Sequence, residues 1–362
     1  GVMMSHGGIS RRLINFANLL IGRLPGSLAH TNIVANMLFG AISGSAVASA
    51  TSIGSVMKPL QDEQGYAPEF STAVNAVSAP TGLLIPPSNT LILYSLVSGG
   101  TSIATLFVAG YIPGILWGLS CMIVAYVFAK KNNYPVSERV SFKQGLKITL
   151  QALPALSLII IVVGGIIFGF FTPTEGSAVA VLYAVLLMLC YRTFSLKNLP
   201  AMLFETAKTT GTVMLLIGAS SMMIHIMTIA NIPNAIANAL LSVSSNPNVI
   251  MMLLIIFLLF VGTFMDIAPA VLIFTPIFLP ICKGFGMNVI HFGIFITYAM
   301  CIGGITPPVG NILFAACAVS KMPIEKVIKP MLPFFIAIIA VLLLVTYIPA
   351  LSLALPTWLG LM

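Results

Sequence analysis

The sequence has 362 residues, of which 59% are hydrophobic and only 7% are charged. Soluble domains carry roughly 25% charged residues, so this composition excludes a soluble globular protein and indicates many membrane-spanning helices. The net charge of +8 does not indicate nucleic-acid binding, because the basic residues lie in short connections between apolar runs. The five cysteines form no C-x-x-C pair, and we expect them to be small core residues rather than disulfides or metal ligands.

The first 27 residues predict the edge of a membrane region. Gly1-Val2-Met3-Met4 resembles the end of a span, and we expect the natural chain to begin before it. Residues 9–24 place three arginines among apolar residues at helical spacing, which predicts an amphipathic helix at the interface. We assign residues 1–27 to the end of a scaffold span followed by this arm helix.

Residues 28–100 predict a hairpin and a broken helix. The apolar run 28–60 is interrupted at Ser43-Gly44-Ser45, which leaves two arms of about 14 residues, too short to span a bilayer that needs about 20. A re-entrant helical hairpin with its tip at these residues fits better. Residues 68–99 follow as one helix broken at Pro86-Pro87.

Residues 101–247 predict scaffold spans and arm helices. The predicted spans are 101–129, 153–171, 176–191 and 200–230. The connection 130–147 is rich in lysine and arginine, so the positive-inside rule places it in the cytoplasm. The segment 231–247 carries no charge, as expected of an external segment.

Residues 248–320 repeat the first pattern. A second hairpin is predicted over 248–283, with its tip near Thr263–Asp266, and a second broken helix over 287–320, around Pro307-Pro308. Residues 321–362 predict a C-terminal scaffold span. One offset of 221 residues relates the two halves, and it pairs Gly82 with Gly303, Pro86 with Pro307, Pro87 with Pro308, Pro59 with Pro280 and Gly65 with Gly286.

The charge pattern predicts that the two repeats are inverted. Tracing the chain from the cytoplasmic connection 130–147, the first hairpin enters the membrane from the cytoplasm and the second enters from outside. Broken helices at corresponding positions of inverted halves are typical of the binding sites of transporters.

The breaks and tips predict ion and substrate sites. A proline pair frees upstream carbonyls that lipid cannot satisfy; carbonyls and helix C-termini favour cations, whereas helix N-termini favour anions. Each half is therefore predicted to hold one cation between its tip and its break. The predicted cation ligands are Ser43, Ser45, Gly82, Ile85, Pro86 and Asn89 in the first half and Thr263, Asp266, Gly303, Thr306 and Asn311 in the second. The predicted substrate-binding residues are Ser43, Gly44, Ser45, Ser88, Asn89, Thr90, Asp266, Pro308 and Asn311.

Tight helix packing is the alternative reading of these small residues. We favour packing for the Ser/Ala-rich run 46–55 and function for the tips and breaks, because tip and break recur together. Asp266 alone among the eight acids falls at a tip predicted deep in the membrane. It is open whether it acts as a cation ligand, a proton carrier or a helix cap.

Several classes of function compete. A channel also uses hairpins and carbonyls, but it does not accumulate its substrate. An enzyme needs a nucleophile with a base or a metal cluster, and the sequence contains neither G-x-S-x-G nor H-E-x-x-H, so we predict no enzymatic activity. No nucleotide-binding loop is present, so we do not expect ATP to drive this chain.

Several motifs resemble one transporter family. FGAISGSAVASATSIGSVMKP (39–59), APTGLLIPPSNTLILYS (79–95), FTPTEGSAVAVLYA (171–184), GTFMDIAPAVLIFTPIFLPI (262–281) and GGITPPVGN (303–311) resemble the large membrane subunit of tripartite ATP-independent periplasmic (TRAP) transporters. The resemblance covers essentially the whole chain. It implies an all-α polytopic protein of the bacterial inner membrane with an elevator-type ion-transporter-superfamily fold, built from inverted repeats with two re-entrant hairpins and two broken helices.

The same resemblance implies a function and partners. It implies sodium-coupled uptake of a small organic acid, of the sialic acid or C4-dicarboxylate type, with at least two Na⁺ sites at the tips and breaks. A periplasmic substrate-binding (P) protein, a small membrane (Q) subunit and membrane lipid are the implied partners, with no nucleic acid. A proton-coupled or channel-like organic anion permease is the alternative.

Overall fold

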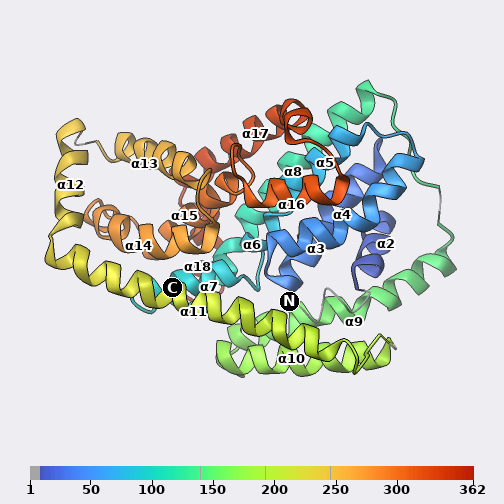
Figure 1. Cartoon of the computed structure of the whole chain (residues 1–362), viewed down its shortest axis with the longest axis horizontal. Helices are drawn as coiled ribbons and strands as arrows, with labels where there is room; N and C mark the ends of the chain where they lie inside the picture. Colours follow the sequence, from blue (N-terminus) through green and yellow to red (C-terminus); the bar gives the residue numbers. More distant parts are fainter. Residues whose placement is uncertain (1–8, 139, 192, 245) are drawn as a thin grey trace.

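The computed structural model describes residues 9–138, 140–191, 193–244 and 246–362, and all regular elements in these ranges are helices (Figure 1). Six of the described helices are long and apolar enough to cross a membrane. They are α8 (Ile103–Lys131), α9 (Phe142–Ile167), α10 (Pro173–Cys190), α11 (Leu199–Ile229), α14 (Ile267–Gly284) and α17 (Ile324–Tyr347). The prediction of an all-α polytopic protein is confirmed.

The first repeat begins with two helices packed side by side, α3 (Ser27–Ser43) and α4 (Ala46–Glu63). The chain reverses between them at Gly44, whose φ of 63° favours glycine. After these come α5 (Pro68–Ser78), α6 (Thr81–Leu84) and α7 (Asn89–Val97). The break lies between α6 and α7, where the Pro86–Pro87 peptide bond is cis.

The second repeat contains corresponding elements, α13 (Pro247–Gly262), α14, α15 (Val289–Gly303) and α16 (Asn311–Ser320), with α15 in the place of α5 and α6. Its break, between α15 and α16, also contains a cis bond, Pro307–Pro308. Gly65 and Gly286, which the offset pairs, each follow the second arm of a hairpin with positive φ, 75° and 81°. The correspondence between the halves therefore extends from sequence to backbone conformation.

The two repeats pack crosswise. The second arm of the first hairpin, α4, lies beside α16, and the second arm of the second hairpin, α14, lies beside α7. A Cβ placed on Gly54 of α4 would lie 3.5 Å from Val319 of α16. Between the repeats, Trp117 of α8 packs against Tyr298 of α15, with ring centroids 4.7 Å apart, and donates a 2.8 Å hydrogen bond to the carbonyl of Val77. The hairpins and broken helices thus share one core.

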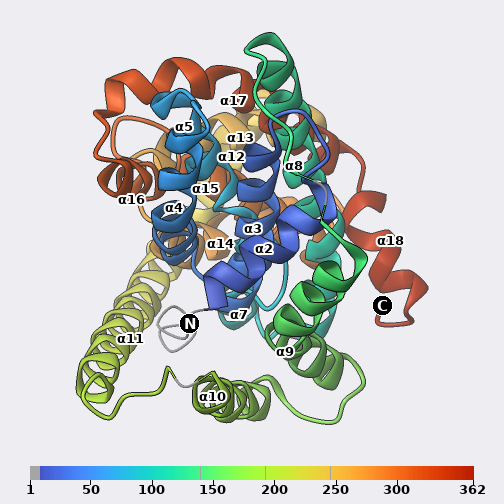
Figure 2. The ribbon, with the colours of Figure 1, turned by 90° about the vertical axis from the view of Figure 1, so that its right-hand side faces the viewer.

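The remaining helices surround this core. Three of them are α2 (Ile9–Ile21), which packs against α3 and α9, α12 (Ile232–Val243) and α18 (Ala350–Trp358). Figure 2 shows α10 and α11 below the main body, and the membrane-grade part of α11 is only 6% buried. Membrane proteins expose such apolar helix faces to lipid or to partner subunits.

One element differs from the sequence expectation. Helix α9 begins at Phe142, inside the predicted loop 130–147, because the Gln144 side chain accepts the Ser141 N–H and residues 142–153 form an amphipathic first half. The segment 231–247 contains helix α12. The expectation for Gly1–Met4 and the charge of Arg139 lie outside the described residues.

Candidate functional site

The first hairpin tip lies against the start of α7. Ser45 caps α4, and its hydroxyl oxygen accepts the Ala48 N–H at 3.3 Å. The Ser43 hydroxyl donates to the carbonyl of Ser45 at 3.3 Å. A Cβ on Gly44 would lie 3.1 Å from Cγ of Asn89, so the structure brings the predicted tip residues and Asn89 together.

The first break is held by side-chain and backbone contacts. The Ser88 hydroxyl donates to the carbonyl of Leu83 and accepts the Leu91 N–H at 3.3 Å, which caps α7. A Cβ on Gly82 would lie 2.2 Å from Cα of Gly40, so the break touches hairpin arm α3 backbone to backbone. The predicted residues Ile85, Pro86 and Thr90 are buried around this contact.

The second tip is built differently. The Thr263 hydroxyl donates to the carbonyl of Phe260 at 2.7 Å. Asp266 caps α14, and its Oδ1 accepts the Ile267 N–H at 2.9 Å. The Asp266 side chain is exposed, so its second oxygen is free to meet a ligand or water. Of the three roles predicted for Asp266, helix capping is therefore observed, and it is compatible with the other two.

The second break also contacts its own tip. The Gly310 N–H donates to the carbonyl of Thr263 at 3.5 Å. A Cβ on Gly303 would lie 2.5 Å from Cα of Gly262, the counterpart of the Gly82–Gly40 contact. Thr306 donates to the carbonyl of Ile302 at 2.7 Å. Pro308 and Asn311 are exposed beside this contact.

Tip and break therefore meet in both repeats, although different residues cap the helices that begin there. Four helices, α4, α7, α14 and α16, begin at a tip or a break, at Ser45, Ser88, Asp266 and Gly310. Their first N–H groups favour anions, whereas hydroxyl, amide and carbonyl oxygens around them suit small hard cations.

A buried polar network holds the first hairpin, and sequence reasoning missed it. Asn36 Nδ2 lies 2.8 Å from Asn32 Oδ1, 3.1 Å from Asn75 Oδ1 and 2.8 Å from Ser78 Oγ. The Ser49 hydroxyl donates to Asn36 Oδ1 at 2.7 Å. The available signal was an asparagine pair one helical turn apart in an apolar run. The offset of 221 places phenylalanine and isoleucine in the second repeat where the first has Asn36 and Asn75, so the network belongs to one repeat only.

A cavity of about 460 Å³ lies along α4, starting at the first tip. It is lined by Ser45, Val47, Ala48, Thr51, Ser52 and Ser55 on the α4 side and by Glu205 of α11. The packing interpretation of the run 46–55 fits Ser49, which is fully buried. It does not fit Thr51, Ser52 and Ser55, which line the cavity. Their spacing at i, i+1 and i+4 places these three residues near one face of α4, and this was the sequence signal for a polar lining.

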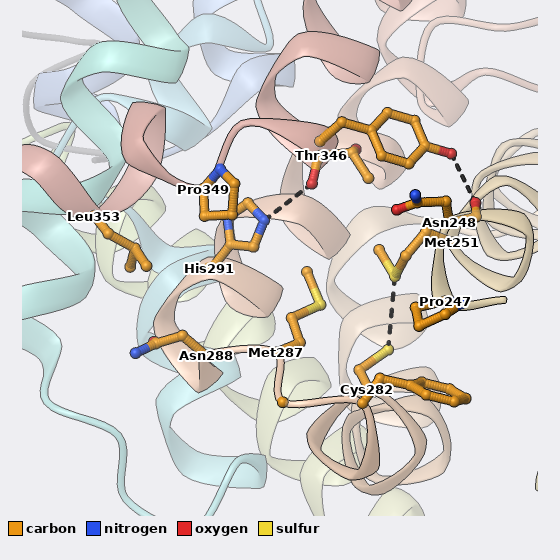
Figure 3. A pocket seen from close by; sticks show the side chains of 13 residues that line it. Pro247, Asn248, Met251, Cys282, Met287, Asn288, His291, Thr346, Pro349 and Leu353 are labelled. Carbon is orange, nitrogen blue, oxygen red and sulfur yellow. Dashed lines mark hydrogen bonds between the residues drawn. The ribbon is translucent and has the colours of Figure 1, made fainter.

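A second cavity, of about 320 Å³, lies away from the tips, where the starts of α13 and α15 meet the ends of α14 and α17 (Figure 3). His291 is 2% exposed there. Its Nε2 donates to the carbonyl of Thr346 at 3.2 Å, and its Nδ1 lies 3.1 Å from Ser352 Oγ. Both ring nitrogens are satisfied within the protein, so we interpret His291 as a packing residue.

Comparison with known proteins gives one consistent result. Residues 1–351 match the family described as "Tripartite ATP-independent periplasmic transporter, DctM component". The chain is 40% identical over 361 residues to the C4-dicarboxylate TRAP transporter large permease protein DctM of Pseudomonas aeruginosa, covering 99% of this chain and 84% of that protein. It is 36% identical over 358 residues to the sialic acid TRAP transporter large permease protein SiaM of Vibrio cholerae, covering 98% and 83%.

A third relative, the isethionate TRAP transporter permease protein DctMQ of Oleidesulfovibrio alaskensis, is 39% identical over 353 residues, which cover 97% of this chain and 55% of that protein. These relatives are named for three different organic acids, and all are called TRAP permeases. The chain therefore belongs to the DctM family, the large permease component of tripartite ATP-independent periplasmic transporters, and is a multi-pass protein of the bacterial inner membrane.

Proposed function

We propose that this permease takes up an organic acid by sodium-coupled secondary transport, with the tips and breaks as its sodium sites. The observation that carries the proposal is that each tip contacts the break of its own repeat, through Gly44 and Asn89 in the first and through Thr263 and Gly310 in the second. Helix breaks in corresponding positions are typical of the ion sites of secondary transporters.

The donor atoms fit sodium. Both sites offer carbonyl, hydroxyl and amide oxygens, which are the ligands that hard cations prefer. In the first repeat we assign the ion to Ser43, Ser45, Asn89 and the backbone from Gly82 to Pro86, and in the second to Thr263, Asp266, Gly303, Thr306 and Asn311. Asp266 is the one carboxylate among the ligands assigned to the two sites, and it is exposed at its tip.

The cavity along α4 is our proposed place for the organic acid. Among the residues that the structure describes, Glu205 is its only charged lining residue, so none of them neutralises a carboxylate there. We propose that the N-terminus of α4, with the Ser45 hydroxyl, binds it instead. Sialic acid or a C4-dicarboxylate is the proposed substrate, since relatives are named for both.

An elevator is the proposed mechanism. Because α4 packs on α16 and α14 packs on α7, the two site-bearing repeats form one body that can move as a unit. The peripheral helices α9 to α11 are proposed to belong to the static scaffold. A periplasmic binding protein is proposed to deliver the substrate, and a small membrane subunit to complete the scaffold, as the tripartite family implies.

Uptake into proteoliposomes containing the full membrane complex tests this function. Labelled sialic acid and succinate are offered with and without the periplasmic binding protein. Accumulation that requires the binding protein supports the proposal and names the substrate. Downhill flux without the binding protein supports the channel-like alternative, and accumulation driven by a proton gradient alone supports the proton-coupled one.

A further inference from the structure

We propose that the surface formed by α2 and α9 is a binding site for the headgroup of an anionic phospholipid of the cytoplasmic leaflet. We call it the basic surface, and its cations are Arg11, Arg12, Arg23, Lys143 and Lys147. The proposal does not depend on the sodium sites, which lie at the tips and breaks.

The first step is that two segments far apart in sequence lie together. A Cβ on Gly145 of α9 would lie 3.3 Å from Leu19 Cδ1 of α2. At the other end of α2, the Arg12 guanidinium lies 3.6 Å from the centre of the Tyr191 ring, and the Tyr191 hydroxyl donates to the carbonyl of Gln151 at 3.2 Å. The two helices are therefore antiparallel neighbours (Figure 2), so the exposed cations of both lie in one region of the protein.

The second step is charge. Arg11, Arg23, Lys143 and Lys147 are exposed, and within the described ranges none of these four forms an ion pair. The Ser137 N–H donates to the carbonyl of Gly22 at 3.0 Å, which brings the connecting loop and its single acid, Glu138, to the end of α2. These four exposed cations against one acid leave a positive surface that attracts anions.

The third step favours a lipid over a free anion. Phe142, Leu146 and Leu150 lie at i, i+4 and i+8 on α9 and are 88%, 52% and 58% exposed. Lys143 and Lys147 each follow a residue of this apolar stripe by one position. A phospholipid matches both features, with its phosphate at the lysines and its acyl chains over the stripe. A soluble phosphate contacts only the lysines and leaves the apolar stripe uncovered.

The position of the basic surface indicates what a bound lipid does. The connection 130–147 is the most basic of the chain, so the positive-inside rule places this surface at the cytoplasmic leaflet. Helix α2 leads directly into α3, the first arm of the first hairpin. A bound lipid therefore holds the start of the first repeat at the membrane surface.

The test measures lipid binding by the purified membrane complex, with phosphatidylglycerol or phosphatidylcholine titrated in detergent and bound lipid counted by native mass spectrometry. We expect phosphatidylglycerol to bind more tightly. K143Q/K147Q removes two cations near an anionic surface and is expected to weaken its binding by roughly 30-fold. K143R/K147R keeps the charge and is expected to bind as the wild type does.

The matched control is K326Q/K329Q, which removes two exposed lysines from the start of α17. It is expected to leave phosphatidylglycerol binding unchanged. Equal binding of the two lipids, or an equal loss in K143Q/K147Q and the control, would overturn the proposal. Displacement of the lipid by millimolar inorganic phosphate would assign the surface to a free anion instead and would also overturn it.

Discussion

Replacing Gly82 with alanine tests the contact between break and hairpin. The new Cβ would lie 2.2 Å from Cα and 2.3 Å from the carbonyl carbon of Gly40, whereas ordinary contacts begin near 3.4 Å. The atoms in conflict belong to the backbones of α6 and α3, so no side chain can rotate away. The two segments must separate by about 1.2 Å.

Such overpacking typically costs about 1–3 kcal/mol. If the strain falls on the sodium-bound state, the same energy corresponds to roughly 5- to 150-fold weaker sodium activation. Two assays follow from this: thermal unfolding of the purified complex, and uptake as a function of sodium concentration. We expect G82A to raise the sodium concentration that gives half-maximal uptake. Expression and membrane insertion are expected to change much less.

Gly164→Ala and Gly218→Ala are the matched controls, because a Cβ at either position meets nothing within 4 Å. Both are expected to retain wild-type sodium activation. Gly303→Ala, whose Cβ would lie 2.5 Å from Cα of Gly262, is expected to act as G82A does on the second site. Wild-type stability and sodium activation in G82A would refute the close-contact reasoning.

Four further variants test the site and the polar network beside it. Asp266→Ala is expected to lower transport and weaken its sodium dependence; unchanged sodium activation would remove Asp266 from the cation site. Ser43→Ala and Ser45→Ala are expected to impair uptake while membrane insertion stays normal, and normal uptake in both would favour a packing role for that tip. Asn36→Leu leaves buried partners unpaired and is expected to lower stability by about 1–3 kcal/mol in thermal unfolding, whereas an unchanged melting temperature would show that the polar network contributes little.

The repeat was predictable because the residues that recur in both halves are ones that break helices. Proline and glycine leave a backbone signature wherever they stand, so Pro86 and Pro307 marked both breaks, and Gly65 and Gly286 marked the ends of both second arms. An offset in such residues carries over to the structure without knowledge of any tertiary contact. The positions of both breaks followed directly.

Contacts between helices were not predictable in the same way. The crosswise packing of α4 on α16 depends on how distant segments meet, and no local pattern states it. Ser49, Thr51 and Ser52 look alike in sequence, yet Ser49 is buried in the polar network and the other two line a cavity. The face of a helix that meets a neighbour decides these roles, and one sequence alone does not reveal it.

The start of α9 shows a third kind of difference. Lysines in the run 130–147 predicted a loop, because charge and membrane burial exclude each other. In the structure Lys143 and Lys147 lie on a helix whose first half is amphipathic, so the charge stays exposed without ending the helix. The positive-inside rule places such charges on one side of the membrane and does not specify whether they sit in a loop or a helix.

The most direct test of the central claim is uptake of the identified organic acid into proteoliposomes of the full membrane complex, with the binding protein present and an inward sodium gradient imposed. Choline replaces sodium in the control, at the same membrane potential and pH. The account predicts accumulation against the substrate gradient with sodium and none with choline. Equal accumulation with choline would contradict it, and the assignment of sodium to both tip-and-break sites would have to be withdrawn.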